Sequence, residues 1–215
     1  MVIPARDEGG LIARAVEAAW RLRDVGQVLV VDSCSQDSTG RLAERAGAMV
    51  LRAVAPGKGQ ALALGLKAAS GEVILLADAD LNDFSPLSGL VRLVAEGTVD
   101  LAIAAPPRLY PRPGLGLARG VALHGIKLAT GLTLTAPLSG QRALTRKLAR
   151  ALQPLAAGWG AEVGMTIDAA RLGARIVEVP VAVVDRGSGR DLAGFWHRGK
   201  QFADICLALA VRLGR

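Results

Sequence analysis

The chain has 215 residues, 51% hydrophobic and only 3% aromatic, which suits one substantial core and argues against a disordered chain. The net charge of +7, from 26 Lys and Arg against 19 Asp and Glu, favours anionic partners. The two cysteines, Cys34 and Cys206, are too few and too distant for a disulfide framework or a paired-cysteine metal site. Because no membrane span or secretory leader is evident, we expect a cytoplasmic protein.

Short apolar runs alternate with amphipathic segments through the first half of the chain. The runs predict strands at residues 2–3, 28–31 and 48–51 and from residue 73, and the segments between them predict helices at residues 11–23, up to 45, 60–69 and after Pro86. Such alternation is typical of a parallel sheet covered by helices on both faces. Ligands of such sheets bind beyond the carboxyl ends of the strands, so the residues that follow each strand are candidate site residues.

The apolar run that begins at Val73 ends in Asp78-Ala79-Asp80. Its uninterrupted apolar character predicts a strand buried on both faces, with the acids at its carboxyl end. Carboxylate oxygens suit Mg²⁺ or Mn²⁺, which take one or two carboxylates together with substrate phosphates. The pair therefore predicts a diphosphate site, whereas a solvated acidic turn is the alternative for an isolated Asp-x-Asp.

Two further loops follow predicted strands. Asp32 ends the second strand ahead of a polar cluster that can cap the next helix, so we expect its side chain to face the ligand crevice. Pro56-Gly57-Lys58-Gly59 precedes a helix, and a lysine at a helix N-terminus suits a diphosphate, although this loop does not have the spacing of a P-loop. A plain connecting loop is the alternative.

The second half of the chain is less regular. Residues 99–104 continue the sheet, and residues 106–120 predict a loop in which Arg108, Arg112 and Arg119 favour either an anion-binding lid or a solvated basic segment. His124 is expected on a helix surface. A short return strand is predicted within residues 134–144, with Thr145 opening the next helix and residues 176–184 forming the last strand.

Glu162 lies early in a helix that follows Gly158-Trp159-Gly160. Its carboxylate either complements the helix dipole or points into the cleft beside Trp159. Residues 191–215 form a predicted basic amphipathic helix, which could pack on the domain, pair with a second subunit or lie on a membrane surface.

The order of six segments resembles the GT-A glycosyltransferases of the family 2 type, most closely the glucosyl-3-phosphoglycerate synthases. The segments are Pro4-Ala5-Arg6-Asp7-Glu8, Val31-Asp32-Ser33 with Ser35, Asp37 and Thr39, Pro56-Gly57-Lys58-Gly59, Asp78-Ala79-Asp80, Pro137-Leu138-Ser139-Gly140, and Gly158-Trp159-Gly160-Ala161-Glu162. The resemblance covers residues 2–186. It implies an α/β GT-A fold, with a mostly parallel central sheet flanked by helices, in a domain of residues 1–190 that is followed by the amphipathic helical tail of residues 191–215.

The resemblance also implies ligands and residue roles. The donor would be a nucleotide sugar, UDP-glucose above all, and the cofactor Mg²⁺ or Mn²⁺. The residues implied in holding the nucleotide sugar are Pro4, Ala5, Arg6, Glu8, Asp32, Ser33, Lys58, Asp78 and Ala79, with Lys58 at the diphosphate and Asp78 at the ribose side. Asp80 would hold the metal, and Glu162 would be the catalytic carboxylate near the acceptor. Arg119, Gly140 and Trp159 would contact the acceptor.

The sequence departs from the family at two places. Asp185 stands where the family supplies a histidine as a further metal ligand, and an oxygen ligand there would suit a hard cation. Residues 116–120 keep Arg119 but lack the glycine triplet and the following threonine of the phosphoglycerate-binding segment. The donor is therefore better defined than the acceptor.

Our first hypothesis is a metal-dependent glycosyltransferase that acts on a small anionic acceptor such as 3-phosphoglycerate, with Arg119 and Arg112 receiving the anion. The alternatives are a polyprenyl-phosphate sugar transferase that uses the tail at a membrane surface, and a nucleotide-sugar binding module without turnover. A nucleotidyltransferase is disfavoured, because that sheet type opens with a glycine-rich loop. We expect no nucleic-acid partner, and a homodimer through the tail is a further hypothesis.

Overall fold

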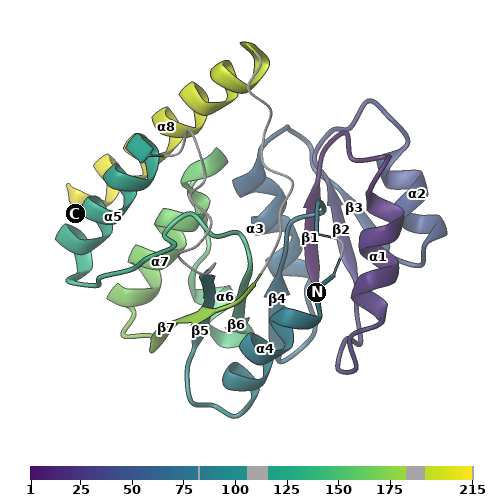
Figure 1. Ribbon diagram of the computed structural model, residues 1–215, viewed down its shortest axis with the longest axis horizontal. Coiled ribbons are helices and arrows are strands. Elements are labelled where there is room, and N and C mark those ends of the chain that lie inside the picture. The colour runs from purple at the N-terminus through teal and green to yellow at the C-terminus, as the bar shows by residue number, and fades with distance from the viewer. Residues whose placement is uncertain (82, 106–115, 183–191, 215) are drawn as a thin grey trace.

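The computed structural model describes residues 1–81, 83–105, 116–182 and 192–214, without the side chains of residues 192–198. Its central sheet has the strand order β3-β2-β1-β4-β6-β5-β7 (Figure 1). The strands are β1 (Val2–Ala5), β2 (Leu29–Asp32), β3 (Met49–Arg52), β4 (Val73–Leu76), β5 (Leu101–Ala105), β6 (Arg142–Thr145) and β7 (Ile176–Pro180). The pairs are parallel except that β6 runs antiparallel to both β4 and β5. The predicted mostly parallel sheet is confirmed.

Helices cover both faces of this sheet. They are α1 (Ile12–Trp20), α2 (Thr39–Arg45), α3 (Lys58–Ala68), α4 (Ser88–Ala95), α5 (Gly116–Thr130), α6 (Arg146–Ala151), α7 (Ala161–Arg171) and α8 (Leu192–Leu213), with the short 3₁₀ helices η1 (Ser85–Leu87) and η2 (Gly158–Gly160). One buried cluster joins α1, α2 and α4 to one face of the sheet, and a second joins α3, α6 and α7 to the other face.

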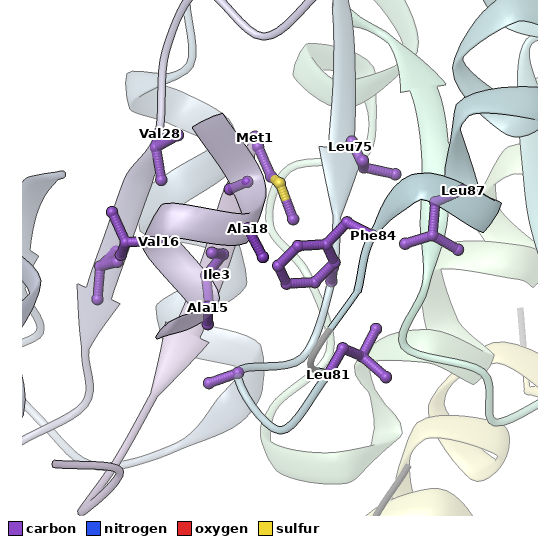
Figure 2. Close-up of a cluster of buried hydrophobic side chains, with 14 of the residues drawn as sticks. Met1, Ile3, Ala15, Val16, Ala18, Val28, Leu75, Leu81, Phe84 and Leu87 are labelled. Atoms are coloured by element: carbon purple, nitrogen blue, oxygen red, sulfur yellow. The ribbon is translucent and has the colours of Figure 1, made fainter. Parts of the chain in front are cut away.

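The alternation of side chains along each strand supplies both layers of the core. Ile3 and Val30 contribute to the first cluster, whereas their neighbour Val2 contributes to the second. Figure 2 shows the ring of Phe84 among Met1 and other side chains of the first cluster. Phe84 is fully buried, and burial of such a side chain stabilises a fold by about 1.5–3 kcal/mol.

A third cluster joins α5, α7 and α8 at one end of the molecule (Figure 1). Ile205 and Leu209 of α8 are buried there against Val163 and Ile167 of α7. Packing on the domain was one of the three placements expected for the C-terminal helix, while the division of the chain at residue 190 stays a prediction. None of the described helices combines the length and the apolarity that crossing a bilayer demands.

The second half of the chain contains the main departure from prediction. Residues 116–120 belong to α5, so the prediction that Arg119 lies in a loop is wrong; the glycines at residues 116 and 120 are tolerated on the exposed side of this helix. Arg108 and Arg112 lie outside the described residues. Thr145 is confirmed as the N-cap of α6, because its hydroxyl accepts a hydrogen bond from the backbone N–H of Leu148 at 3.1 Å.

Candidate active site

The candidate site lies at the carboxyl ends of β1, β2 and β4. β1 is parallel to β2 on one side and to β4 on the other, so the strand order reverses beside it, which is where ligands bind in open α/β sheets. Ala5 is paired with Asp32 in register, and the backbone N–H of Ser33 donates to the carbonyl of Ala5 at 2.8 Å. The segment Asp78-Ala79-Asp80 follows β4 at the same edge.

Lys58, the first residue of α3, joins two acids from distant parts of the chain. Its Nζ lies 2.8 Å from Oδ1 of Asp78 and 2.8 Å from Oε1 of Glu162, and 5.0 Å from the centre of the Trp159 ring. The Lys58 side chain is 13% exposed and that of Glu162 only 4%. Burial alone would lower the pKa of the Lys58 ammonium, but the charges of Asp78 and Glu162 outweigh it and raise the pKa above its ordinary value.

Asp78 is held in place by the loop that precedes β6. Nε2 of Gln141 donates to Oδ2 of Asp78 at 3.0 Å. A Cβ atom at residue 140 would lie 2.3 Å from the same oxygen, so Gly140 is required for this close approach. The structure therefore brings Gly140 next to Asp78, and sequence reasoning had missed the role of Gln141.

Glu8 adds a further acid to this edge. Burial, followed by the negative charges of Asp80 and Asp37, raises the pKa of the Glu8 carboxyl above its ordinary value of 4.5. Among the described residues no group of three His, Cys, Asp or Glu side chains could by itself hold a metal ion. The donor set nevertheless fits Mg²⁺ or Mn²⁺, since these ions are commonly bound by one or two carboxylates and completed by substrate phosphates. Asp185 lies outside the described residues.

A cavity of about 530 Å³ opens beside the end of β2. Asp32, Ser38, Arg41 and Arg52 are among its lining residues. Asp32 accepts a hydrogen bond from the backbone N–H of Ser35 at 2.9 Å, which fixes its carboxylate at the rim. Sequence reasoning missed both arginines, because basic residues on an amphipathic helix and at the end of a strand look like solvated positions.

Ser33 lies between the lining residues Asp32 and Cys34 and contacts the loop that precedes Lys58. Its hydroxyl accepts a hydrogen bond from the backbone N–H of Gly57 at 2.9 Å. The other residues predicted at the donor lie in or next to β1 and in the segment after β4. Pro4 is part of β1, Arg6 is exposed with its Nε 3.6 Å from a carboxylate oxygen of Asp7, and Ala79 is buried between the two acids that flank it.

Arg142 is a buried cation beneath the site that sequence reasoning did not single out. Its guanidinium is fully buried and donates to the carbonyls of Ser139 (2.8 Å) and Pro137 (3.1 Å) and to the hydroxyl of Thr166 (2.9 Å). Burial lowers its pKa to about 10, although the charge of Glu162 acts in the opposite direction. It therefore ties the segment before Gly140 to α7. An arginine directly before the apolar pair Ala143-Leu144 was the available signal.

Arg119 contacts the loop beside this cluster. It donates from Nη2 to the carbonyl of Thr135 at 3.0 Å, in the segment that leads to Gly140. Thr135 is held in turn by Glu178 of β7, which accepts from its backbone N–H and its hydroxyl. The predicted acceptor residues thus divide into Gly140 and Trp159, which contact the cluster, and Arg119, which supports the neighbouring loop.

Residues 1–116 match the family model described as Glycosyl transferase family 2. The glucosyl-3-phosphoglycerate synthase of Mycobacterium tuberculosis is 32% identical over 194 residues, an alignment that covers 78% of this chain and 59% of that protein. The undecaprenyl-phosphate mannosyltransferase of Micrococcus luteus is 34% identical over 191 residues, covering 79% of this chain and 77% of that protein. The chain thus spans about three fifths of the length of the synthases it matches.

Solved structures extend the similarity to almost the whole chain. The crystal structure of the Mycobacterium tuberculosis synthase with Mn²⁺, UDP-glucose and phosphoglyceric acid has a TM-score of 0.83 and 31% identity, over 99% of this chain and 78% of that one. A structure of the same synthase with Mg²⁺ and UDP has a TM-score of 0.77 and 30% identity, with the same coverage.

Proposed function

This chain belongs to glycosyltransferase family 2 and has its GT-A fold, and we propose that it transfers glucose from UDP-glucose to a small anionic acceptor such as 3-phosphoglycerate, with Mg²⁺ or Mn²⁺ as cofactor. The observation that carries the proposal is the junction at Lys58. One ammonium joins Asp78 at the end of β4 to Glu162 at the start of α7, at the sheet edge that also bears Glu8 and Asp32.

The donor would lie across the ends of β1, β2 and β4. The cavity beside Asp32 has a volume within the usual range for small-molecule sites and supports a nucleoside there, next to the strand end where Ala5 pairs with Asp32; Pro4 and Ser33 would complete that end of the donor site. Lys58 at the N-terminus of α3 suits the diphosphate, because a point charge adds to the positive end of the helix dipole. Asp80 would hold the ion. When bound, the ion would supply positive charge that offsets the negative charge growing on the departing diphosphate.

The acceptor would lie beside Trp159 and Glu162. A carboxylate in that place can orient an acceptor hydroxyl or receive its proton. Lys58 contacts Glu162 and would also meet the diphosphate, so the same ammonium lies between the proposed leaving group and the proposed acceptor group. Arg119 would receive the acceptor's anionic group.

Donor binding is tested by calorimetry with UDP-glucose and Mn²⁺. We expect wild type to bind and Asp80→Ala to bind at least about tenfold more weakly, since a metal-holding carboxylate is lost. Asp100→Asn is the matched control, because Asp100 precedes β5 at the opposite edge of the sheet and pairs with Arg175. Absence of binding by wild type, or equal binding by wild type and Asp80→Ala, would contradict the proposal.

Acceptor use is tested by following UDP release with and without 3-phosphoglycerate. Release that depends on the acceptor supports transfer and rules out a binding module without turnover. Arg119→Ala is expected to raise the KM for the acceptor by about tenfold or more, because it removes a charged hydrogen-bond donor, and to leave donor affinity unchanged. An unchanged acceptor KM would remove Arg119 from the acceptor site.

A second candidate is transfer to a polyprenyl phosphate at a membrane surface. The similarity to the undecaprenyl-phosphate mannosyltransferase favours it, as do Leu117 and Leu128, which are 82% and 75% exposed on α5. Flotation with vesicles that contain polyprenyl phosphate separates the two candidates. If the lipid is the acceptor, wild type floats and Leu117→Glu with Leu128→Glu stays in solution. Transfer to 3-phosphoglycerate without vesicle binding supports the first candidate.

A further inference from the structure

Asp204 of α8 reaches the turn that carries Trp159. Its Oδ2 accepts a hydrogen bond from the backbone N–H of Trp159 at 3.1 Å. The backbone of Gly158 has a φ of +55°, and a Cβ atom at that residue would lie 2.0 Å from the same oxygen. The turn therefore bends closely around the carboxylate, in a conformation that glycine adopts without strain.

Two more glycines let α8 lie against this turn. A Cβ atom at Gly160 would lie 2.6 Å from the Cβ of Ala208, and one at Gly164 would lie 2.9 Å from the guanidinium carbon of Arg212. The glycines around Trp159 are thus the surface on which α8 packs. This explains the glycine spacing in Gly-Trp-Gly-Ala-Glu without a ligand, and leaves Trp159 and Glu162 as the side chains of that motif that reach Lys58.

We propose that Asp204 is a positioning residue for the transfer reaction. Its carboxylate holds the backbone of Trp159, and through that turn it places the Trp159 ring over the Lys58 ammonium and sets the start of α7, from which Glu162 projects. A carboxylate suits this position because a charged acceptor makes a stronger hydrogen bond to an N–H than a neutral one does. The inference rests on the proposed function for its kinetic part only.

An acid on α7 that pairs with α8 provides a matched control for Asp204. Asp168 of α7 forms an ion pair with the guanidinium of Arg212, so it ties α8 to α7, whereas Asp204 ties α8 to the Trp159 turn. Its loss should weaken the packing of α8 at Arg212, while Asp204, about two helical turns earlier, keeps its hydrogen bond to the Trp159 turn. Variants at Asp168 and Asp204 therefore distinguish the packing of α8 on α7 from the positioning of the Trp159 turn.

The kinetic test compares Asp204→Ala, Asp204→Asn and Asp168→Asn at a temperature at which all are folded by circular dichroism. Asp204→Ala is expected to lower kcat about 10-fold or more, as the loss of a supporting contact commonly does, with the KM for UDP-glucose changed less than about threefold. Asp204→Asn should recover most of kcat, because its amide oxygen can accept the same N–H. Asp168→Asn should keep the wild-type kcat and lower only the unfolding temperature.

Hydrogen exchange at the Trp159 amide tests the contact without turnover. Exchange should become about 10-fold faster in Asp204→Ala and stay slow in Asp204→Asn and Asp168→Asn. If Asp204→Ala does not fold, Asp204→Ser is used instead. Its side chain is polar but shorter than that of aspartate, so its oxygen no longer reaches the Trp159 N–H. Unchanged exchange, or an equal fall of kcat in Asp168→Asn, would overturn the inference. If wild type transfers no glucose, the proposed function fails, while the exchange measurement still decides the role of Asp204.

Discussion

Lys58 shows how one side chain can set the geometry of a site. The Lys58 ammonium and the Glu162 carboxylate are both largely buried. Burial of either charge alone would carry a large desolvation penalty, and their contact offsets that penalty. The arrangement is therefore sensitive to the loss of either partner. Asp78, which is more exposed, shares the same ammonium and is held by Gln141 as well.

Lys58→Met is expected to destabilise the fold by about 3 kcal/mol, because it leaves the buried Glu162 charge unpaired. Lys58→Met combined with Glu162→Gln should recover much of this loss, since the unpaired charge is then gone. Urea unfolding of both variants and of Glu162→Gln measures the interaction free energy between Lys58 and Glu162. Lys67→Met, at an exposed lysine of the same helix, is the control and should lie within about 0.5 kcal/mol of wild type. Additive losses would show that the two charges do not interact.

Glu8 should make stability depend on pH in the ligand-free protein. Its pKa is raised on folding, so the stability that it contributes is fully present below the ordinary value of 4.5 and is lost as the pH rises through the raised pKa. Glu8→Gln should therefore melt at a higher temperature than wild type at neutral pH and at the same temperature near pH 4. Thermal unfolding at both pH values measures this. Glu17→Gln, on the exposed side of α1, is the control substitution.

At the scale of elements, helices approach the sheet most closely where small residues face it. Gly65 of α3 packs over β1 and β2, and a Cβ atom there would lie 2.3 Å from Cγ1 of Val2 and 3.1 Å from Cγ2 of Val31. Gly120 of α5 has nothing within 4 Å of the equivalent point. The same residue type therefore has opposite consequences in two helices.

Gly65→Ala should lower the free energy of unfolding by about 1–3 kcal/mol, because the added methyl group overpacks the face between α3 and β1. Gly120→Ala should raise it by about 0.5–1 kcal/mol, because alanine is the better helix former and meets no neighbour. Denaturant unfolding of both variants checks the signs. A gain in stability from Gly65→Ala would show that the helix can shift without cost.

At the scale of the whole molecule, α8 completes the end of the domain formed by α5 and α7. Ile205 and Leu209 are buried in that cluster, and the Arg212 guanidinium is buried against Asp168. α8 therefore contributes to the core and is more than an appended surface helix. Its role in a dimer stays a prediction.

Removal of residues 192–215 should destabilise the domain strongly. Exposure of each buried aliphatic side chain costs about 1.5–3 kcal/mol, and the loss of Ile205 and Leu209 uncovers Val163 and Ile167 of α7. We expect the shortened chain to melt well below the full chain by circular dichroism and to be digested faster by protease. For this reason the membrane test uses substitutions on α5 in place of a truncation. A shortened chain with unchanged melting would make α8 a dispensable tail.

Local patterns in the sequence were enough to predict the layers of the fold. Apolar runs that end in polar residues mark the ends of parallel strands, so Asp32, Asp78 and Asp80 could be assigned to one edge of the sheet. The antiparallel direction of β6 was not predicted, and neither was the start of α5 at Gly116, because the glycines and prolines around residues 106–120 obscure the helical pattern.

The sequence by itself determined the α/β alternation, the acids at the strand ends and the order of motifs that marks the family. Only the tertiary structure decided that Lys58 pairs with Asp78 and Glu162, that Arg142 supports the loop before Gly140 and that Asp204 holds the turn at Trp159. The physical reason is the range of the interactions. Strand and helix patterns repeat within a few residues, whereas these contacts join side chains from different elements and leave no periodic trace in the chain.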